Sequence, residues 1–316
     1  MQAGNADVTD AENPIASTQV PAPGLLTIDH VAHFVPDADA ASAALTQLGF
    51  TLTPFSPQSH RLEPGGPVVP AGTGNRCVML QRGYLEFLTP TGQTPIADQL
   101  RAAIQRYIGV HLIAFGTASP DTDHARLTHA GFDPATPIAL ERPIATEQGK
   151  DIARFTVVRV PPGRMPEGRI QYCHQRTPAL VWQRRWLEHR NGMSGLAGVL
   201  ICVDDPAAAA ARYALYTGLG ADYAQGAWRV ATARGVLTFV DPSALERYLG
   251  ISAPVLPWIA GYALESKEIS ATRDALRATH ADMSDLPERH LLVRLPPALG
   301  GIMIVSASDS SALRFD

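Results

Sequence analysis

The hydrophobic and polar positions of this chain repeat one order of elements four times. Each copy starts with a short apolar strand, passes through a turn with Asp or Pro, and continues with an amphipathic helix and several short strands. The first copy opens with LLTIDHVAHFVPD (25–37). A helix is predicted over 37–49, ending at Gly49, a residue type that favours helix C-termini. The strand-like segments FTLTPF, RCVML and GYLEFLTP follow.

The other three copies repeat this order with similar spacing. The second opens with GVHLIAFGTASPD (109–121), has a helix that ends at Gly131, and continues through FDPATPI, ARFTVVRV and GRIQYCHQ. The third opens with GLAGVLICVDDP (195–206) and has the helix AAAAARYALYTGLG. The fourth opens with PWIAGYALES (257–266) and has the helix KEISATRDALRATH. Repeats of this kind cannot bury their sheets alone and must pair. We therefore predict an α+β fold in which four βαβββ modules pair into two lobes.

The predicted lobes are unequal, and each has a definable boundary. Residues 1–23 lack hydrophobic periodicity and are expected to form a disordered tail. The N-terminal lobe is assigned to 24–192 and the C-terminal lobe to 193–316. The break is placed within TPALVWQRRWLEHRNGMSG (177–195), because this stretch has turn residues and no strand alternation.

Composition narrows the range of partners. Hydrophobic residues make up 46% of the 316-residue chain and charged residues 18%, which rules out global disorder. The net charge of −4 gives no basic excess for nucleic acid or anionic lipid. The N-terminus lacks a secretory signal pattern, and the three cysteines lie far apart without a CxxC motif. We expect a cytoplasmic protein with a small-molecule substrate and no nucleic-acid or membrane partner.

Metal-ligating residue types recur at corresponding positions of the first two copies. The opening strands carry His30 and His111, and the closing strands carry Glu86 in GYLEFL and Gln171 in GRIQYC. A carboxylate flanked by apolar strand residues is costly to bury unless it is paired or bound to a cation. The alternative for the histidines is a partly exposed position at the start of a strand. The alternative for Glu86 is an exposed position on the outer face of the sheet.

The last two copies lack these polar residues. We align Gly198 and Gly261 with the two histidines, and Thr238 and Ile304 with the closing polar residues. A structural role would recur in all four copies. The asymmetry therefore favours a functional site in the N-terminal lobe.

The segments IDHVAHFVPDADAASAALTQLGF, GYLEFL and GVHLIAFGTASPDTDHARLTHAGFD resemble the vicinal oxygen chelate superfamily, which includes glyoxalase I, bleomycin-resistance proteins and extradiol dioxygenases. More narrowly, IQYCHQRTPALVW followed by GLAGV looks like the bacterial glyoxalase-like domain group. The resemblance implies cup-shaped mixed sheets. It also implies one divalent metal ion, Zn, Ni, Mn or Fe, held by His30, Glu86, His111 and the position of Gln171. Many superfamily members have Glu at this last position, and Gln lowers the charge of the site.

Three functions follow from this resemblance. The leading one is a metal-dependent lyase or isomerase that chelates adjacent substrate oxygens and stabilises an enolate-like intermediate, with Glu86 as ligand and proton shuttle. A metal-free binding protein of the bleomycin-resistance type and a ring-cleaving extradiol-type dioxygenase are the alternatives. Arg76 is a candidate to hold a substrate carboxylate, and a surface arginine on a turn is the other interpretation. A homodimer is compatible with all three functions.

Overall fold

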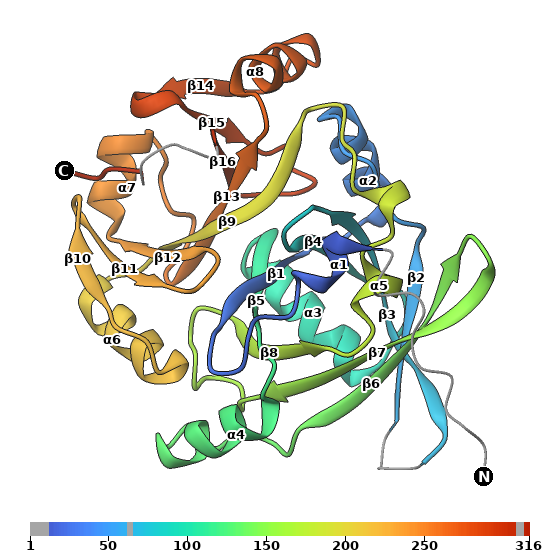
Figure 1. Ribbon diagram of the computed structural model, residues 1–316. Helices are drawn as coiled ribbons and strands as arrows, with labels where there is room; N and C mark the ends of the chain where they lie inside the picture. Colours follow the sequence, from blue (N-terminus) through green and yellow to red (C-terminus); the bar gives the residue numbers. More distant parts are fainter. Residues whose placement is uncertain (1–12, 62–65, 308–312) are drawn as a thin grey trace.

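Two eight-stranded mixed sheets with the same strand order form the molecule (Figure 1). The computed structural model describes residues 13–61, 66–307 and 313–316. The first sheet has the order β2-β3-β4-β1-β5-β8-β7-β6, and the second has the order β10-β11-β12-β9-β13-β16-β15-β14. The strands of the first sheet are β1 (Thr27–Phe34), β2 (Ser56–Arg61), β3 (Val68–Met79), β4 (Tyr84–Pro90), β5 (Gly109–Gly116), β6 (Ile138–Thr146), β7 (Gly149–Arg159) and β8 (Arg169–Gln175). Those of the second are β9 (Met193–Cys202), β10 (Asp222–Ala224), β11 (Ala227–Ala231), β12 (Val236–Val240), β13 (Trp258–Ser266), β14 (Met283–Leu286), β15 (His290–Arg294) and β16 (Ile302–Ala307).

Each sheet is a pair of βαβββ modules. Strand β1 runs parallel to β4 of its own module and antiparallel to β5 of the next, and β9 has the same relation to β12 and β13. The paired opening strands therefore form the centre of each sheet, and the closing strands flank them. The predicted α+β fold of four paired modules is confirmed.

The four repeat helices also form where the sequence predicts them. They are α2 (Ala38–Gln47), α4 (Pro120–His129), α6 (Pro206–Thr217) and α8 (Ile269–Ala278). Asp37 caps α2 by accepting from the amides of Asp39 and Ala40, and Gly218 ends α6 in the left-handed conformation. Two further helices, α3 (Pro95–Arg106) and α7 (Pro242–Leu249), were not predicted. Thr94-Pro95 and Asp241-Pro242, each an N-cap residue followed by proline, are the signals that mark their starts.

Three local expectations need correction. FTLTPF (50–55) is not a strand, and β2 begins only at Ser56. FDPATPI forms no strand before Ile138. Within the expected disordered tail, Pro14–Ser17 form the short helix α1, which docks because the side-chain amide of Asn13 donates to the carbonyl of Trp182 at 2.7 Å. Residues 1–12 of that tail lie outside the described residues.

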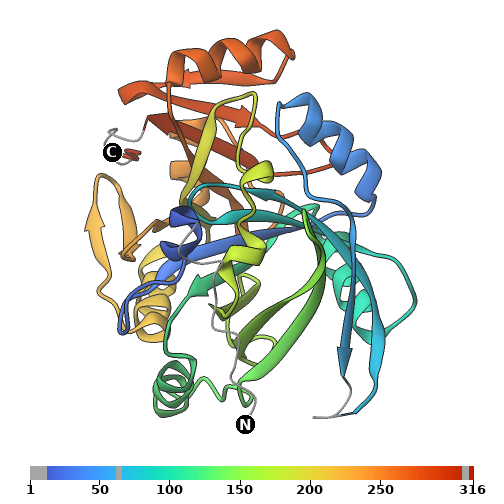
Figure 2. The same ribbon diagram turned by 45° about the vertical axis from the view of Figure 1, so that its right-hand side comes forward.

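One hydrophobic core joins the two lobes, which lie against each other in both ribbon views (Figures 1 and 2). Buried side chains of α2, α4, α6 and α8 belong to this core together with residues of both sheets. No helix in the described part of the chain is long and apolar enough to cross a membrane. The remaining short elements are α5 (Pro178–Val181) and the 3-10 turns η1 (Arg184–Trp186) and η2 (Pro287–Arg289).

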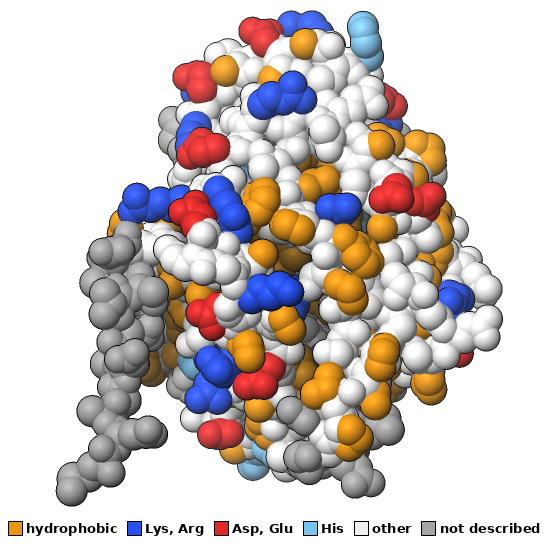
Figure 3. Space-filling model, turned by 90° about the vertical axis from the view of Figure 1, so that its right-hand side faces the viewer, with side chains coloured by type: hydrophobic (Ala, Val, Ile, Leu, Met, Phe, Trp, Pro, Cys, Tyr) orange, Lys and Arg blue, Asp and Glu red, His pale blue; other side chains and the backbone are white. Residues whose placement is uncertain are grey.

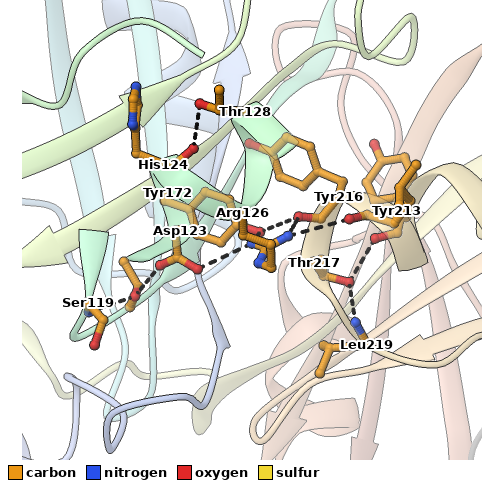
Figure 4. A network of polar contacts seen from close by, with 12 residues as sticks. Ser119, Asp123, His124, Arg126, Thr128, Tyr172, Tyr213, Tyr216, Thr217 and Leu219 are labelled. Carbon is orange, nitrogen blue, oxygen red and sulfur yellow. Dashed lines mark hydrogen bonds and ion pairs between the residues drawn. The ribbon is translucent and has the colours of Figure 1, made fainter. Parts of the chain in front are cut away.

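A polar network crosses the lobe interface beside this core (Figure 4). Arg126 of α4 donates to the Tyr172 hydroxyl at 2.6 Å and to the carbonyl of Tyr216 on α6. The Tyr172 hydroxyl donates to the same carbonyl at 2.7 Å, and the two tyrosine rings stack 5.2 Å apart. Asp123 pairs with Arg126 at 3.2 Å. The network satisfies carbonyl groups at the C-terminal end of α6 that the helix itself cannot pair.

Candidate active site in the N-terminal lobe

The first sheet curves around a cavity of about 770 Å³ that is lined by His30, Glu86, His111 and Gln171. These four predicted residues lie on β1, β4, β5 and β8, the central strands of the sheet. All four are buried, with exposed fractions of 4%, 8%, 4% and 5%. The structure therefore brings the sequence-predicted residues to the wall of one cavity.

His30 and Glu86 form the centre of the candidate site. His30 Nδ1 donates to the buried Asp29 carboxylate at 2.6 Å, and in the neutral tautomer that makes this bond Nε2 carries the lone pair. That Nε2 lies 4.0 Å from Glu86 Oε2, while Glu86 Oε1 accepts from the side-chain amide of Asn75. The ring of Tyr84 stacks on His30 at 4.3 Å. Both functional side chains are thus held in place by buried neighbours.

Two β-bulges set the positions of Asp29 and His111. Asp29 is the extra residue of β1 between the pairs Ile28–Phe115 and His30–Ala114, and His111 is the extra residue of β5 between Val110 and Leu112. Bulges redirect side chains and are common beside active sites. The sequence supplies no direct signal for a bulge, so the involvement of Asp29 was missed.

The C-terminal lobe has the same two bulges without the polar side chains. Ala197 takes the place of Asp29, and Ala260 takes the place of His111. The alignment of Gly261 with His111 is therefore wrong by one residue, because the bulge shifts the register. Gly198 does correspond to His30, and there a Cβ would meet the Val236 carbonyl oxygen at 2.6 Å.

His111 and Gln171 make contacts within the protein. His111 Nε2 donates to the Tyr107 carbonyl at 2.8 Å, and its ring stacks on Tyr107 at 3.9 Å and on Phe34 at 5.2 Å. Burial lowers the pKa of His111 to about 4, so the ring is neutral at pH 7. The side-chain carbonyl of Gln171 accepts from Arg159 Nε at 3.2 Å.

These contacts decide how well the predicted ligands fit a divalent metal. Ligand atoms about 2.1 Å from a tetrahedral ion lie roughly 3.4 Å apart, so His30 and Glu86 are close to the spacing of two neighbouring ligands. His111 Nε2 and the Gln171 oxygen are occupied by Tyr107 and Arg159. Among the described residues, no group of three His, Cys, Asp or Glu side chains is positioned to hold a metal ion. As they stand, the four predicted ligands do not fit one metal site.

Arg76 lies elsewhere in the lobe. Its guanidinium packs over the Phe55 ring at 5.9 Å and donates to the Thr53 carbonyl at 3.3 Å, and Arg76 is not among the described residues that line the cavity. The preceding residue on β3, Asn75, is the one that reaches Glu86, as strand alternation requires.

Four other arginines do line the cavity and were missed by the sequence analysis: the exposed Arg106 at the end of α3, Arg142 on β6, Arg159 on β7 and Arg169 on β8. Arg169 could have been found, because it precedes Gln171 by two residues and so lies on the same strand face. Arg142 and Arg159 belong to a long hairpin whose course over the cup the local pattern does not define.

The corresponding cup of the C-terminal lobe is filled with its own side chains. Ile302 and Ile304 of β16 pack there with Leu245 of α7, Trp258 and the C-terminal Phe315 in one apolar cluster. Thr238 takes the position of Glu86, since it pairs with Leu200 as Glu86 pairs with Ala32. The polar constellation is therefore confined to the first lobe.

Comparison with known proteins agrees with this architecture. Residues 28–217 match the family model of the glyoxalase-like domain. No curated protein sequence matches the chain. Among solved structures, a hypothetical protein from Staphylococcus aureus has a TM-score of 0.60 at 10% identity, and the match covers 90% of this chain and 100% of that one.

Two further structural relatives have named activities. A triple mutant of 4-hydroxymandelate synthase from Streptomyces coelicolor has a TM-score of 0.56 at 14% identity, with 92% of this chain and 95% of that chain covered. A xylose isomerase-like TIM barrel/4-hydroxyphenylpyruvate dioxygenase fusion protein has a TM-score of 0.53 at 10% identity, with 93% of this chain and 51% of that chain covered. At these identities the likeness shows the fold alone. The chain belongs to the glyoxalase-like domain family and has the vicinal oxygen chelate fold.

Proposed function

We propose that the protein is an enzyme of the lyase or isomerase type that moves a proton on a small molecule bound in the N-terminal cup. The observation that supports this proposal is the buried Asp29–His30 pair facing Glu86 at one wall of the cavity. A carboxylate and an imidazole within reach of one bound molecule are the usual groups for general acid–base catalysis.

The two side chains have different roles in this proposal. Glu86 takes a proton from carbon next to a substrate carbonyl. His30 accepts this proton from Glu86 at the lone pair of Nε2 and returns it to the developing oxygen or to the neighbouring carbon, which restores the neutral imidazole. Asn75 holds one oxygen of Glu86, so the other oxygen is left to face the substrate. Asp29 positions the imidazole and stabilises its protonated form.

The proposed roles are tested by proton exchange, because exchange is visible before the net reaction is known. Protein in D₂O is incubated with a panel of 2-hydroxy acids, 2-keto acids and thioesters, and ¹H NMR follows the loss of the signal next to the carbonyl. We expect exchange with at least one compound and a loss of 10²-fold or more in Glu86→Gln, within the usual range for a general base. Glu141→Gln is the matched control, because Glu141 is exposed and paired with Arg154 at 3.3 Å. Equal rates in the wild type and Glu86→Gln contradict the assignment.

A divalent metal remains part of this test. His30 and Glu86 are the two predicted ligands whose spacing suits a shared ion, although the four predicted ligands together do not fit one. Elemental analysis of protein purified without added metal, with His30→Ala and His111→Ala beside it, measures this directly. Stoichiometric metal that both variants lose would show that His111 turns away from Tyr107 to ligate.

A binding protein without catalysis is the second candidate. The Tyr107–His111 and Arg159–Gln171 contacts favour it, since they satisfy two predicted ligands within the protein. Ligand-observed NMR on the same panel separates the two functions. A compound that binds the cup without exchanging any proton supports the binding protein and contradicts the enzyme.

A further inference from the structure

The cavity wall carries more arginines than carboxylates. One of these arginines, Arg106, is exposed and donates to the Pro257 carbonyl. Arg142, Arg159 and Arg169 also line the cavity, and the single carboxylate that is an electrostatic neighbour of all three is Glu86. Glu141 also lies on the cavity wall, but it is exposed and paired with Arg154. The surface in Figure 3, by contrast, carries acidic and basic side chains side by side.

The direct partners of the three arginines are neutral. Arg159 donates to the Gln171 carbonyl at 3.2 Å, and Arg169 donates to the Gln99 carbonyl at 3.5 Å. Arg142 lies over the Phe155 ring at 5.6 Å and beside the thiol of Cys77. Burial raises the pKa of that thiol to about 12, so it stays protonated and gives Arg142 no negative charge. None of the three forms an ion pair with a carboxylate within the described ranges.

Burial makes this excess charge costly. Burial lowers the pKa of Arg169 to about 10, with a further contribution from the positive charge of Arg159. Burial also lowers the pKa of Arg159. Both side chains are still charged at pH 7, so each guanidinium has donors that an anion would satisfy.

The fold itself does not require charges at these positions. The residue that corresponds to Arg159 in the C-terminal lobe is Leu292, and the one that corresponds to Arg169 is Ile302. Both are buried in the apolar cluster that fills the second cup. The second sheet has the same strand order as the first and has apolar residues at these two positions. The sheet therefore closes without arginine.

We propose that Arg142, Arg159 and Arg169 bind the anionic group of an organic acid whose apolar body occupies the rest of the cavity. This proposal rests on the proposed function, because it names the substrate class of the same cup. The cavity of about 770 Å³ is far larger than an inorganic anion needs, and many of its other lining residues are apolar. Phe34, Leu88, Phe155 and Val157 are among these apolar residues. Planar guanidinium groups match carboxylate and phosphate equally in geometry, so the shared feature is an anion on an apolar body.

Binding of three matched probes to the full-length protein tests this proposal by isothermal titration calorimetry. The probes are 2-naphthoate, 2-naphthyl phosphate and the uncharged 2-naphthamide. We expect at least one of the two anions to bind ten times more tightly than the amide, and the tighter of the two identifies the natural group. Arg159→Gln and Arg169→Gln each weaken anion binding roughly tenfold or more and leave the amide unchanged. Arg169→Lys keeps the charge and retains part of the affinity.

Two controls keep the outcome specific. Arg164→Gln removes an exposed arginine from the segment before β8 and is expected to bind the anions like the wild type. Near-UV circular dichroism confirms that each variant is folded. Equal affinity for the anions and the amide, no binding of any probe, or full anion affinity in Arg159→Gln and Arg169→Gln would each overturn the proposal. Glu86→Gln separates the two proposals: it retains anion binding if the arginines bind the anion, whatever its effect on proton exchange.

Discussion

Replacing His33 with glutamine should make the protein less sensitive to acid. His33 is fully buried at the interface of the two lobes, where its ring stacks on Phe87 at 4.8 Å and meets the edge of Tyr262 at 5.4 Å. Its Nδ1 donates to the carbonyl of Leu299 at 2.9 Å, and its Nε2 has no hydrogen-bond partner within the described structure. A proton added to this ring would be a buried charge without a counter-ion.

The size of the effect follows from the pKa of His33. Burial is the main cause that lowers this pKa from 6.5 to about 4, and the nearby His111 lowers it further, while the bond to Leu299 opposes the shift. Above pH 6.5 the imidazole is neutral in both the folded and unfolded chain, so it has no effect on the pH dependence of stability. Between pH 6.5 and 4 the unfolded chain binds a proton that the folded chain does not. Each pH unit then costs about 1.4 kcal/mol, or about 2.5 kcal/mol by pH 4.5.

Urea unfolding of wild type and His33→Gln at pH 7.5, 6.5, 5.5 and 4.5 measures this contribution. The variant is expected to be less stable at pH 7.5 by roughly 1–3 kcal/mol, because it loses ring packing and alters the bond to Leu299. That difference should shrink by about 2.5 kcal/mol at pH 4.5. Tryptophan fluorescence and far-UV circular dichroism must give coincident transitions for these free energies to be meaningful.

The exposed His129 provides the control, since His129→Gln should leave the pH dependence unchanged. His111 and His189, whose pKa values burial also lowers, remain in the variant and preserve part of the acid sensitivity. A stability difference between wild type and His33→Gln that is constant from pH 7.5 to 4.5 would refute the reasoning.

Three further changes test other parts of the structure. Arg126→Ala removes the donor that bridges α4 to the end of α6. Thermal and urea unfolding should show a free energy of unfolding that is lower by roughly 1–2 kcal/mol. An unchanged free energy would mean that solvent replaces the network. Gly261→Ala would drive a methyl group into the carbonyl oxygen of Ile302 on the neighbouring strand, and a loss of roughly 1–3 kcal/mol or more is expected in urea unfolding. Asp29→Asn keeps the volume but not the charge beside His30, so it should slow proton exchange in the NMR assay while 2-naphthoate still binds; unchanged exchange would contradict the positioning role of Asp29.

The repeat pattern was sufficient to predict the architecture of the molecule. Strand, helix and glycine recur at fixed intervals, and each recurrence reflects local chemistry: an N-cap, an apolar face and a left-handed residue at the helix end. The helices α3 and α7 escaped notice because they connect one module to the next and so lie outside the repeated order, and only the N-cap and proline mark their starts. The strand β2 was placed too early, since FTLTPF has the composition of a strand but, in the described part of the chain, only Thr53 makes a backbone bond to β3, to the Cys77 carbonyl, and no ladder forms.

The candidate site was predictable only in part, for a geometric reason. Sequence spacing placed His30, Glu86, His111 and Gln171 on the wall of one cavity, because corresponding strands of paired modules meet at the sheet centre. Spacing does not reveal what each side chain bonds, and so the partners of His111 and Gln171 were not foreseen. The bulge that carries His111 also shifted the alignment of the fourth module by one residue.

The two lobes together show which features belong to the fold and which to the site. Both lobes keep the bulges on their opening strands, so the bulges are part of how paired modules close into a cup. In the second lobe alanine occupies both bulges, and apolar side chains fill the space that the first lobe leaves open. Half-buried arginines beside a single shared carboxylate carry a desolvation cost that isoleucine or leucine at the same positions would not carry. The first lobe retains the costlier residues beside an open cavity, which is where a bound anion can offset their charge.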